Sequence, residues 1–242
     1  MAILTAVSTA ARKVLPLGHC TAILVAAGSA ARMGGIDKVM ADLGGRPLVS
    51  YSLEAFQTCG AIREIVVVTR PDLVEPITNL ARSMGAAKVT QVIPGGATRA
   101  ESVTKGLAAV SKETKLVAIH DAARPFISQA VIDRAVRAAH SYRAAAPAIP
   151  VKDTIKVAPG GVVESTPERK NLFAVQTPQC FDVDAIRGAL SVADLDAITD
   201  DCSAVEQMGM SVKLVEGDEC NFKVTTPLDL TLAKAILAER SV

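Results

Sequence analysis

Hydrophobic residues occur along the chain in short continuous runs that alternate with longer amphipathic stretches. Four runs have the length and β-branched content of strands: residues 21–27, 64–69, 88–93 and 116–120. Three stretches between them have the spacing of helices: residues 47–59, 72–84 and 98–110. Ser128 is a suitable N-cap for a fourth helix. This alternation predicts an α/β fold with a Rossmann-like, mostly parallel sheet and helices on both faces.

The pattern changes after residue 144, where prolines become frequent and Pro159-Gly160-Gly161 separates two short strand-like runs. This predicts a protruding β-arm at about residues 147–170 instead of another strand–helix unit. The alternation then resumes, with helices expected at residues 182–192 and 199–208 and a strand at residues 212–216. A final helix begins at Thr226 and Pro227, with Asp229 completing a capping box.

Composition narrows the class of protein. The 242 residues suit an N-terminal extension at residues 1–20 and a single domain at residues 21–242. A balance of 26 basic and 25 acidic residues, with 3% aromatics and no Trp, argues against nucleic-acid and membrane-surface binding. No apolar run approaches the roughly 18 residues of a membrane span. The five scattered cysteines contain no CxxC pair, which indicates a reducing, cytoplasmic environment.

The loop after the first expected strand reads AAGSAARMGGIDK, from Ala26 to Lys38. Small residues let the backbone approach a ligand, and consecutive N–H groups form a concavity for anions. Arg32 and Lys38 add two cations, so we interpret the loop as a triphosphate site, although a purely structural turn would look similar. It matches neither the P-loop pattern nor the dinucleotide fingerprint.

Three further stretches carry candidate chemistry at strand ends. In the segment GGATRAES, Thr98 and Glu101 are suited to capping a helix, which leaves Arg99 and Ser102 as ligand contacts. Asp121, in HDAARP, is suited to bind hydrated Mg²⁺, unless it pairs with Arg124 to hold the turn. Lys223, in NFKVT, either points into the site or is a solvated surface lysine.

These stretches, together with KDT at residues 152–154, QTPQCF at residues 176–181 and ITDD at residues 198–201, occur in the order typical of one family. Over about residues 21–237 the chain resembles 2-C-methyl-D-erythritol 4-phosphate cytidylyltransferase, of the non-mevalonate isoprenoid pathway. The resemblance implies a fold of the nucleotide-diphospho-sugar transferase type. It also implies Mg²⁺-assisted transfer of CMP from CTP to methylerythritol phosphate, which releases pyrophosphate and gives 4-diphosphocytidyl-2-C-methyl-D-erythritol.

The resemblance also implies roles for individual residues. Arg32, Lys38 and Lys223 would be catalytic cations, and Asp121 would hold Mg²⁺. The implied substrate-binding residues are Ala26, Ala27, Gly28, Gly96, Arg99, Ser102, Arg124, Thr154, Arg169 and Asp200. Of these, Thr154 and Arg169 lie in the arm and would complete the site of a neighbouring chain in a homodimer.

The sequence departs from the usual family pattern at Asp37, where Pro commonly precedes the lysine, and at Ala97, where relatives often have an acid. Two alternatives stay open. One is a cytidylyltransferase for another polyol phosphate, such as ribitol 5-phosphate. The other is a nucleotide-binding module without catalysis.

Overall fold

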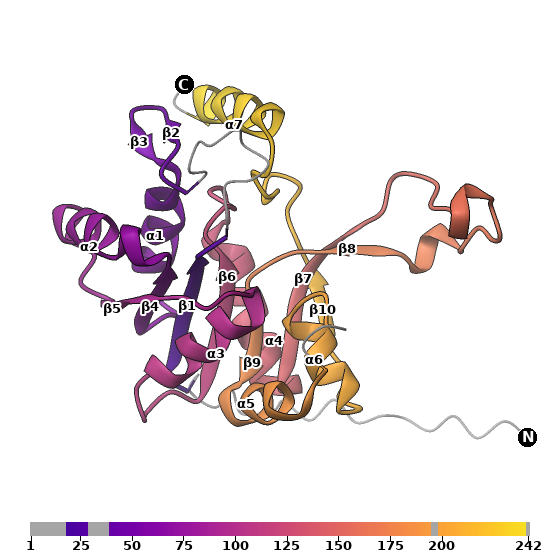
Figure 1. The fold of residues 1–242 in the computed structure, drawn as a ribbon, viewed down its shortest axis with the longest axis horizontal. Coiled ribbons are helices and arrows are strands. Elements are labelled where there is room, and N and C mark those ends of the chain that lie inside the picture. The colour runs from indigo at the N-terminus through magenta and orange to yellow at the C-terminus, as the bar shows by residue number, and fades with distance from the viewer. Residues whose placement is uncertain (1–17, 29–38, 195–197, 241–242) are drawn as a thin grey trace, which may run out of the picture.

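The centre of the molecule is a mixed β-sheet (Figure 1). The computed structural model describes residues 18–28, 39–194 and 198–240. Strand β1 (Cys20–Ala26) pairs in parallel with β4 (Glu64–Thr69) on one side and β6 (Leu116–Asp121) on the other, and β5 (Val89–Pro94) extends the sheet beyond β4. These are the four strands predicted from the hydrophobic runs, and their parallel arrangement is confirmed.

Beyond β6 the sheet contains strands that the sequence pattern did not predict, together with the strand that it expected at residues 212–216, where the structure has one at residues 213–216. Strand β9 (Gln179–Asp182) lies antiparallel between β6 and β7 (Ala144–Pro150), β8 (Phe173–Val175) pairs with the end of β7, and β10 (Lys213–Glu216) closes this side. Within the described residues the order is β10-β7-β9-β6-β1-β4-β5, with β8 beside β7. Pro147, a poor strand residue, lies where β7 ends its pairing with β9 and before it begins pairing with β8.

Helices cover both faces of the sheet, as predicted. Alternate residues of β1 face opposite ways, so Leu24 packs in one hydrophobic cluster and Ile23 in another. The first cluster includes residues of α1 (Leu48–Thr58), α2 (Val74–Ser83) and α4 (Gln129–Tyr142). The second includes residues of α3 (Arg99–Ala109), α5 (Val183–Val192) and α6 (Asp201–Gln207). Fully buried side chains such as Phe56 each stabilise the fold by roughly 1.5–3 kcal/mol.

A smaller cluster holds helix α7 (Pro227–Arg240) over the hairpin of β2 (Asp42–Leu43) and β3 (Arg46–Pro47). The cap predicted for α7 is confirmed, because the Thr226 hydroxyl accepts from Asp229 N–H and the Asp229 carboxylate accepts from Thr226 N–H. No helix among the described residues is long and apolar enough to cross a membrane.

The segment between β7 and β8 leaves the body of the molecule and projects into solvent (Figure 1). It contains two short 3₁₀ turns, Pro159–Gly161 and Arg169–Asn171, and an antiparallel bridge between Val157 and Ser165. Because residues up to Pro150 belong to β7, the projection begins four residues later than the expected arm.

The chain path creates a crevice at one edge of the sheet. From β1 the chain proceeds outward through α1, β4, α2 and β5, and then α3 returns it to β6 on the opposite side of β1. Ligands of open α/β sheets bind where the strand order reverses in this way, at the carboxyl ends of the strands. The fold therefore places a candidate site above the ends of β1 and β6.

Candidate functional site

A cleft of about 320 Å³ lies at this reversal point. It is lined by Val25, Ala26, Ala27, Gly28, Val39, Gly96, Ala97, Thr98, Arg99, Ser102, Asp121, Ala123 and Lys223. The cleft thus brings together eight of the predicted site residues, from four separate parts of the chain: Ala26, Ala27, Gly28, Gly96, Arg99, Ser102, Asp121 and Lys223.

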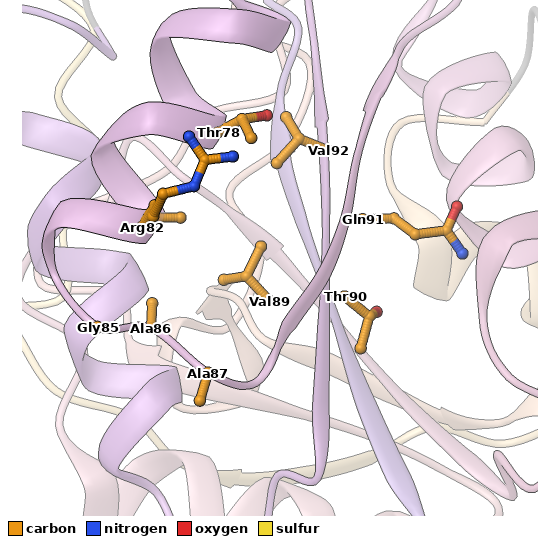
Figure 2. A pocket seen from close by; sticks show the side chains of 10 residues that line it. Thr78, Arg82, Gly85, Ala86, Ala87, Val89, Thr90, Gln91 and Val92 are labelled. Atoms are coloured by element: carbon orange, nitrogen blue, oxygen red, sulfur yellow. The ribbon is translucent and has the colours of Figure 1, made fainter.

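A second hollow, of about 400 Å³, lies between α2 and β5 (Figure 2). Of the described residues that line it, Arg82 alone is charged, and its guanidinium donates to the Asn79 side chain. Gly85, Ala86 and Ala87 form one wall (Figure 2). This hollow lacks converging charged groups, so the cleft at the reversal point is the better candidate for a nucleotide.

The loop between β5 and α3 is held by its own hydrogen bonds. The Thr98 hydroxyl caps α3 by accepting from Glu101 N–H, as predicted, while the Glu101 carboxylate accepts from Ala97 N–H instead of completing the box at Thr98. Ser102 Oγ accepts from Gly96 N–H at 3.1 Å and donates to Thr98 O at 2.9 Å. Ser102, expected to contact the ligand, therefore also shapes the loop.

Asp121 lies between two cations at the end of β6. Arg99 Nε donates to its Oδ1 at 3.2 Å, and Lys223 Nζ lies 2.7 Å from its Oδ2. Burial on its own would raise the pKa of Asp121, but Arg99 and Lys223 outweigh it and hold that pKa well below its usual range. Asp121 is therefore ionised, and Lys223 points into the site instead of being a solvated surface lysine.

Arg99 also pairs with Asp201, at the start of α6, with 2.8 Å between Nη2 and Oδ2. The Asp201 side chain is 1% exposed, and burial raises its pKa against the opposing effect of Arg99. Asp201 is a residue that the sequence analysis did not name, whereas it named the neighbouring Asp200. Asp200 N-caps α6 by accepting from Ser203 N–H, and it lines a small hollow that also includes Thr98 and Arg99 of the cleft. The paired acids of the sequence ITDD were the available signal, and only the fold distinguishes them.

The alternative pairing of Arg124 with Asp121 is not adopted. Arg124 Nη1 donates to the backbone carbonyl of Asn221 at 2.7 Å and so ties the turn after β6 to the segment that carries Lys223. His120, directly before Asp121, is fully buried, which lowers its pKa to about 4 and keeps the ring neutral.

Mg²⁺ is compatible with Asp121. Each carboxylate oxygen has two lone pairs, and Arg99 and Lys223 use one on each, which leaves acceptor capacity on an ionised hard ligand. No group of three or more His, Cys, Asp or Glu in the described ranges could hold a metal. A magnesium ion at Asp121 would therefore take its remaining ligands from phosphates and water, as Mg²⁺ commonly does.

The remaining four predicted residues are not among those that line the cleft in the part of the chain that the structure describes. Arg32 and Lys38 lie outside the described residues. Thr154 and Arg169 lie on the exposed projecting segment, where Arg169 Nη1 donates to Lys152 O.

Comparison with known proteins agrees with this architecture. A family model described as 2-C-methyl-D-erythritol 4-phosphate cytidylyltransferase matches residues 20–239. The protein of that name from Caldanaerobacter subterraneus subsp. tengcongensis is 43% identical over 226 residues, which cover 90% of this chain and 99% of that protein.

Solved structures give the same result. The chain aligns with 4-diphosphocytidyl-2C-methyl-D-erythritol synthase from Anaerococcus prevotii at a TM-score of 0.82 and 30% identity, covering 91% of this chain and 96% of that one. The cytidylyltransferase from Thermus thermophilus aligns at a TM-score of 0.73 and 34% identity, covering 89% of this chain and 98% of that one. The chain therefore belongs to the 2-C-methyl-D-erythritol 4-phosphate cytidylyltransferase family.

Proposed function

We propose that the cleft at the reversal point is where this enzyme transfers CMP from CTP to 2-C-methyl-D-erythritol 4-phosphate. The products are 4-diphosphocytidyl-2-C-methyl-D-erythritol and pyrophosphate, in the non-mevalonate route to isoprenoid precursors. Family membership supports the reaction. The observation that supports the location is the charge cluster of Asp121, Arg99 and Lys223, which lines a cleft otherwise formed by small residues.

The chemistry is a displacement at phosphorus. A phosphate oxygen of methylerythritol phosphate forms a bond to the α-phosphorus of CTP, and the bond to the bridging oxygen breaks to release pyrophosphate. The attacking oxygen is already anionic, so no side chain has to remove a proton. The main cost is bringing two polyanions together, and cations aimed at the developing charge offset that cost.

In this proposal Lys223, held beside the cleft by Asp121, is the described cation that acts on the transferring phosphate. Arg32 and Lys38, which lie outside the described residues, would add two more from the loop after β1. The loop of Gly96 and Ser102 would surround the cytosine, with Ala26, Ala27 and Gly28 against the nucleotide from the opposite side. Arg124 would lie next to the methylerythritol phosphate.

We further propose that Asp121 holds Mg²⁺ during turnover. When bound, the ion would neutralise phosphate charge and favour departure of pyrophosphate. The protein's part is to keep the Asp121 carboxylate ionised, which Arg99 and Lys223 do.

The working unit in this proposal is a homodimer in which the projecting segment reaches a second subunit. Exposed apolar side chains on that segment support the proposal, including Val162 at 75% and Val163 at 57% exposure. Thr154 and Arg169 would then serve the partner's site. We also propose a cytoplasmic location, consistent with five free cysteines, of which four are buried.

The test is pyrophosphate release by the purified enzyme with CTP and Mg²⁺, offered methylerythritol 4-phosphate and ribitol 5-phosphate in separate reactions. We expect release with the first substrate. Release with ribitol 5-phosphate alone would overturn the substrate assignment, and CTP binding without release would indicate a non-catalytic module.

A further inference from the structure

Residues 176–179, with the sequence QTPQ, connect β8 at the root of the projecting segment to β9 in the sheet. Three of these residues have polar side chains, and all three are buried: Gln176 and Thr177 are 4% exposed and Gln179 is 2% exposed. Burying three polar side chains is costly unless each is hydrogen-bonded. Their partners lie in three different segments: the end of β6, the start of α6 and the residues before Lys223.

Thr177 binds the end of β6. Its Oγ1 accepts from Asp121 N–H at 3.2 Å and lies 2.9 Å from His120 Nδ1. The other ring nitrogen, His120 Nε2, lies 3.2 Å from the carbonyl oxygen of Arg124, which can only accept. His120 is therefore protonated at Nε2, and the Thr177 hydroxyl donates to Nδ1. One hydroxyl thus holds both the backbone of Asp121 and the ring that supports the following turn.

Gln179 binds the start of α6. Its Oε1 accepts from the N–H groups of Asp201 at 3.0 Å and Cys202 at 3.1 Å, and its Nε2 donates to Asp200 Oδ2 at 2.5 Å. The same Asp201 carries the carboxylate that pairs with Arg99. Gln179 therefore positions Arg99 through Asp201.

Gln176 binds the segment before Lys223. Its Nε2 donates to Asp218 O at 2.7 Å, and its Oε1 accepts from Asp218 N–H at 3.2 Å and from Asn221 Nδ2 at 3.3 Å. A Cβ at Gly217 would lie 2.6 Å from this Oε1, so a glycine is needed for the close approach. Lys223 lies two residues beyond Asn221, so these hydrogen bonds hold the segment that carries Lys223.

We propose that Gln176, Thr177 and Gln179 are positioning residues that together set Lys223, Asp121 and Arg99 relative to one another in the cleft. The inference rests on the proposed function. None of the three side chains lines the cleft, so they act through the groups they hold. A displacement of about 1 Å in such a constellation can lower turnover roughly 100-fold.

The test compares Thr177→Val, which removes only the hydroxyl, with Thr177→Ser, which retains it. Thr21→Val is the matched control, because Thr21 is also buried and its hydroxyl lies 2.7 Å from the Thr114 hydroxyl. Thr21 lies near the start of β1, at the end of the strand away from the cleft. We expect Thr177→Val to lower kcat about 10- to 100-fold, with a smaller change in KM for CTP, because the loop from Gly96 to Ser102 is untouched. Thr177→Ser and Thr21→Val should keep kcat near the wild-type value.

Equal kcat in folded Thr177→Val and wild type would overturn the proposal, and so would an equal loss of kcat in Thr177→Val and Thr21→Val. A second readout does not depend on turnover. The chain has three histidines, so ¹⁵N resonances of the imidazole rings can be assigned by substitution. In wild type we expect His120 to be the Nε2–H tautomer with a hydrogen-bonded Nδ1. The Nδ1–H tautomer would overturn the proposal even if Thr177→Val failed to fold. If wild type showed no turnover but had the expected tautomer, the proposed function would fail while the described network stood.

Discussion

Arg99 bridges two carboxylates, and replacing it with methionine tests how this buried pairing contributes to the fold. In Arg99→Met, Asp121 keeps Lys223 as its partner, whereas Asp201 loses the cation 2.8 Å away while it is 1% exposed. The loss of folding stability in Arg99→Met should therefore come mainly from the unpaired charge of Asp201. Adding Asp201→Leu to the same chain removes the uncompensated charge.

The structure sets the scale of the effect. Two unit charges about 4 Å apart interact by ~4 kcal/mol at an effective dielectric constant near 20. Removing one partner of a buried pair costs ~3–5 kcal/mol, because the remaining charge is left buried. We expect Arg99→Met to lower the free energy of unfolding by about that amount at pH 7, and Arg99→Met with Asp201→Leu to recover most of it.

The pH dependence adds a signed check. Burial raises the pKa of Asp201 even with Arg99 present, and removing Arg99 should raise it further. A carboxyl with a raised folded-state pKa favours folding when protonated, so the deficit of Arg99→Met should shrink as the pH falls from 7 toward 5. Urea unfolding of the wild type, Arg99→Met and the double variant, at pH 7 and at pH 5, measures the cost of the single substitution, its recovery in the double variant and its dependence on pH. If Arg99→Met cost less than ~1 kcal/mol, or if the effects of the two substitutions were additive, Arg99 would not be compensating the buried charge of Asp201.

Three other predictions concern positions outside the cleft. Gly106→Ala should destabilise by ~1–3 kcal/mol in urea unfolding, because its Cβ would lie 2.6 Å from Ile23 Cγ2, whereas Gly60→Ala, with nothing within 4 Å, should not show this overpacking. Asp229→Ala should cost ~1 kcal/mol at pH 7, and the difference from wild type should close below about pH 4. Burial raises the pKa of Asp229, but hydrogen bonds from Thr225 and Thr226 outweigh it and lower that pKa, so its contribution is lost on acidification. A thiol reagent should modify Cys220 first in the folded protein, since the other four cysteines are buried; equal rates at all five would contradict the packing.

The parallel half of the sheet could be predicted from sequence because its strands are continuous hydrophobic runs of strand length. Most of the other half could not, although β10 was expected at residues 212–216. Strand β7 consists of alanine and proline with a single isoleucine, and alanine and proline are depleted in strands. It is stabilised by pairing with β9 and β10 on either side. The position of β9 between β6 and β7 depends on contacts between distant parts of the chain. Local periodicity carries no information about such contacts, so the position of β9 could not be predicted from it.

The same division applies to the candidate site. Residues that follow predicted strands, such as Gly28 and Asp121, could be placed in the crevice because the carboxyl ends of parallel strands meet at one edge. The pairing of Arg99 with Asp201 joins positions about a hundred residues apart and has no local signature. The buried hydrogen bonds of residues 176–179 could not be predicted either, because glutamine is usually a surface residue and the sequence gives no sign that these glutamines are buried.

If Lys223 acts on the transferring phosphate in the cleft, the effect should be visible in kcat for pyrophosphate release by Lys223→Met. The matched control is Lys234→Met, which removes the same charge from an exposed position on α7. Lys223→Met should fold normally, since Asp121 keeps Arg99 as a partner, and its kcat should fall by roughly 10²–10³ while Lys234→Met retains wild-type turnover. A folded Lys223→Met enzyme with kcat close to wild type would show that Lys223 does not act on the transferring phosphate.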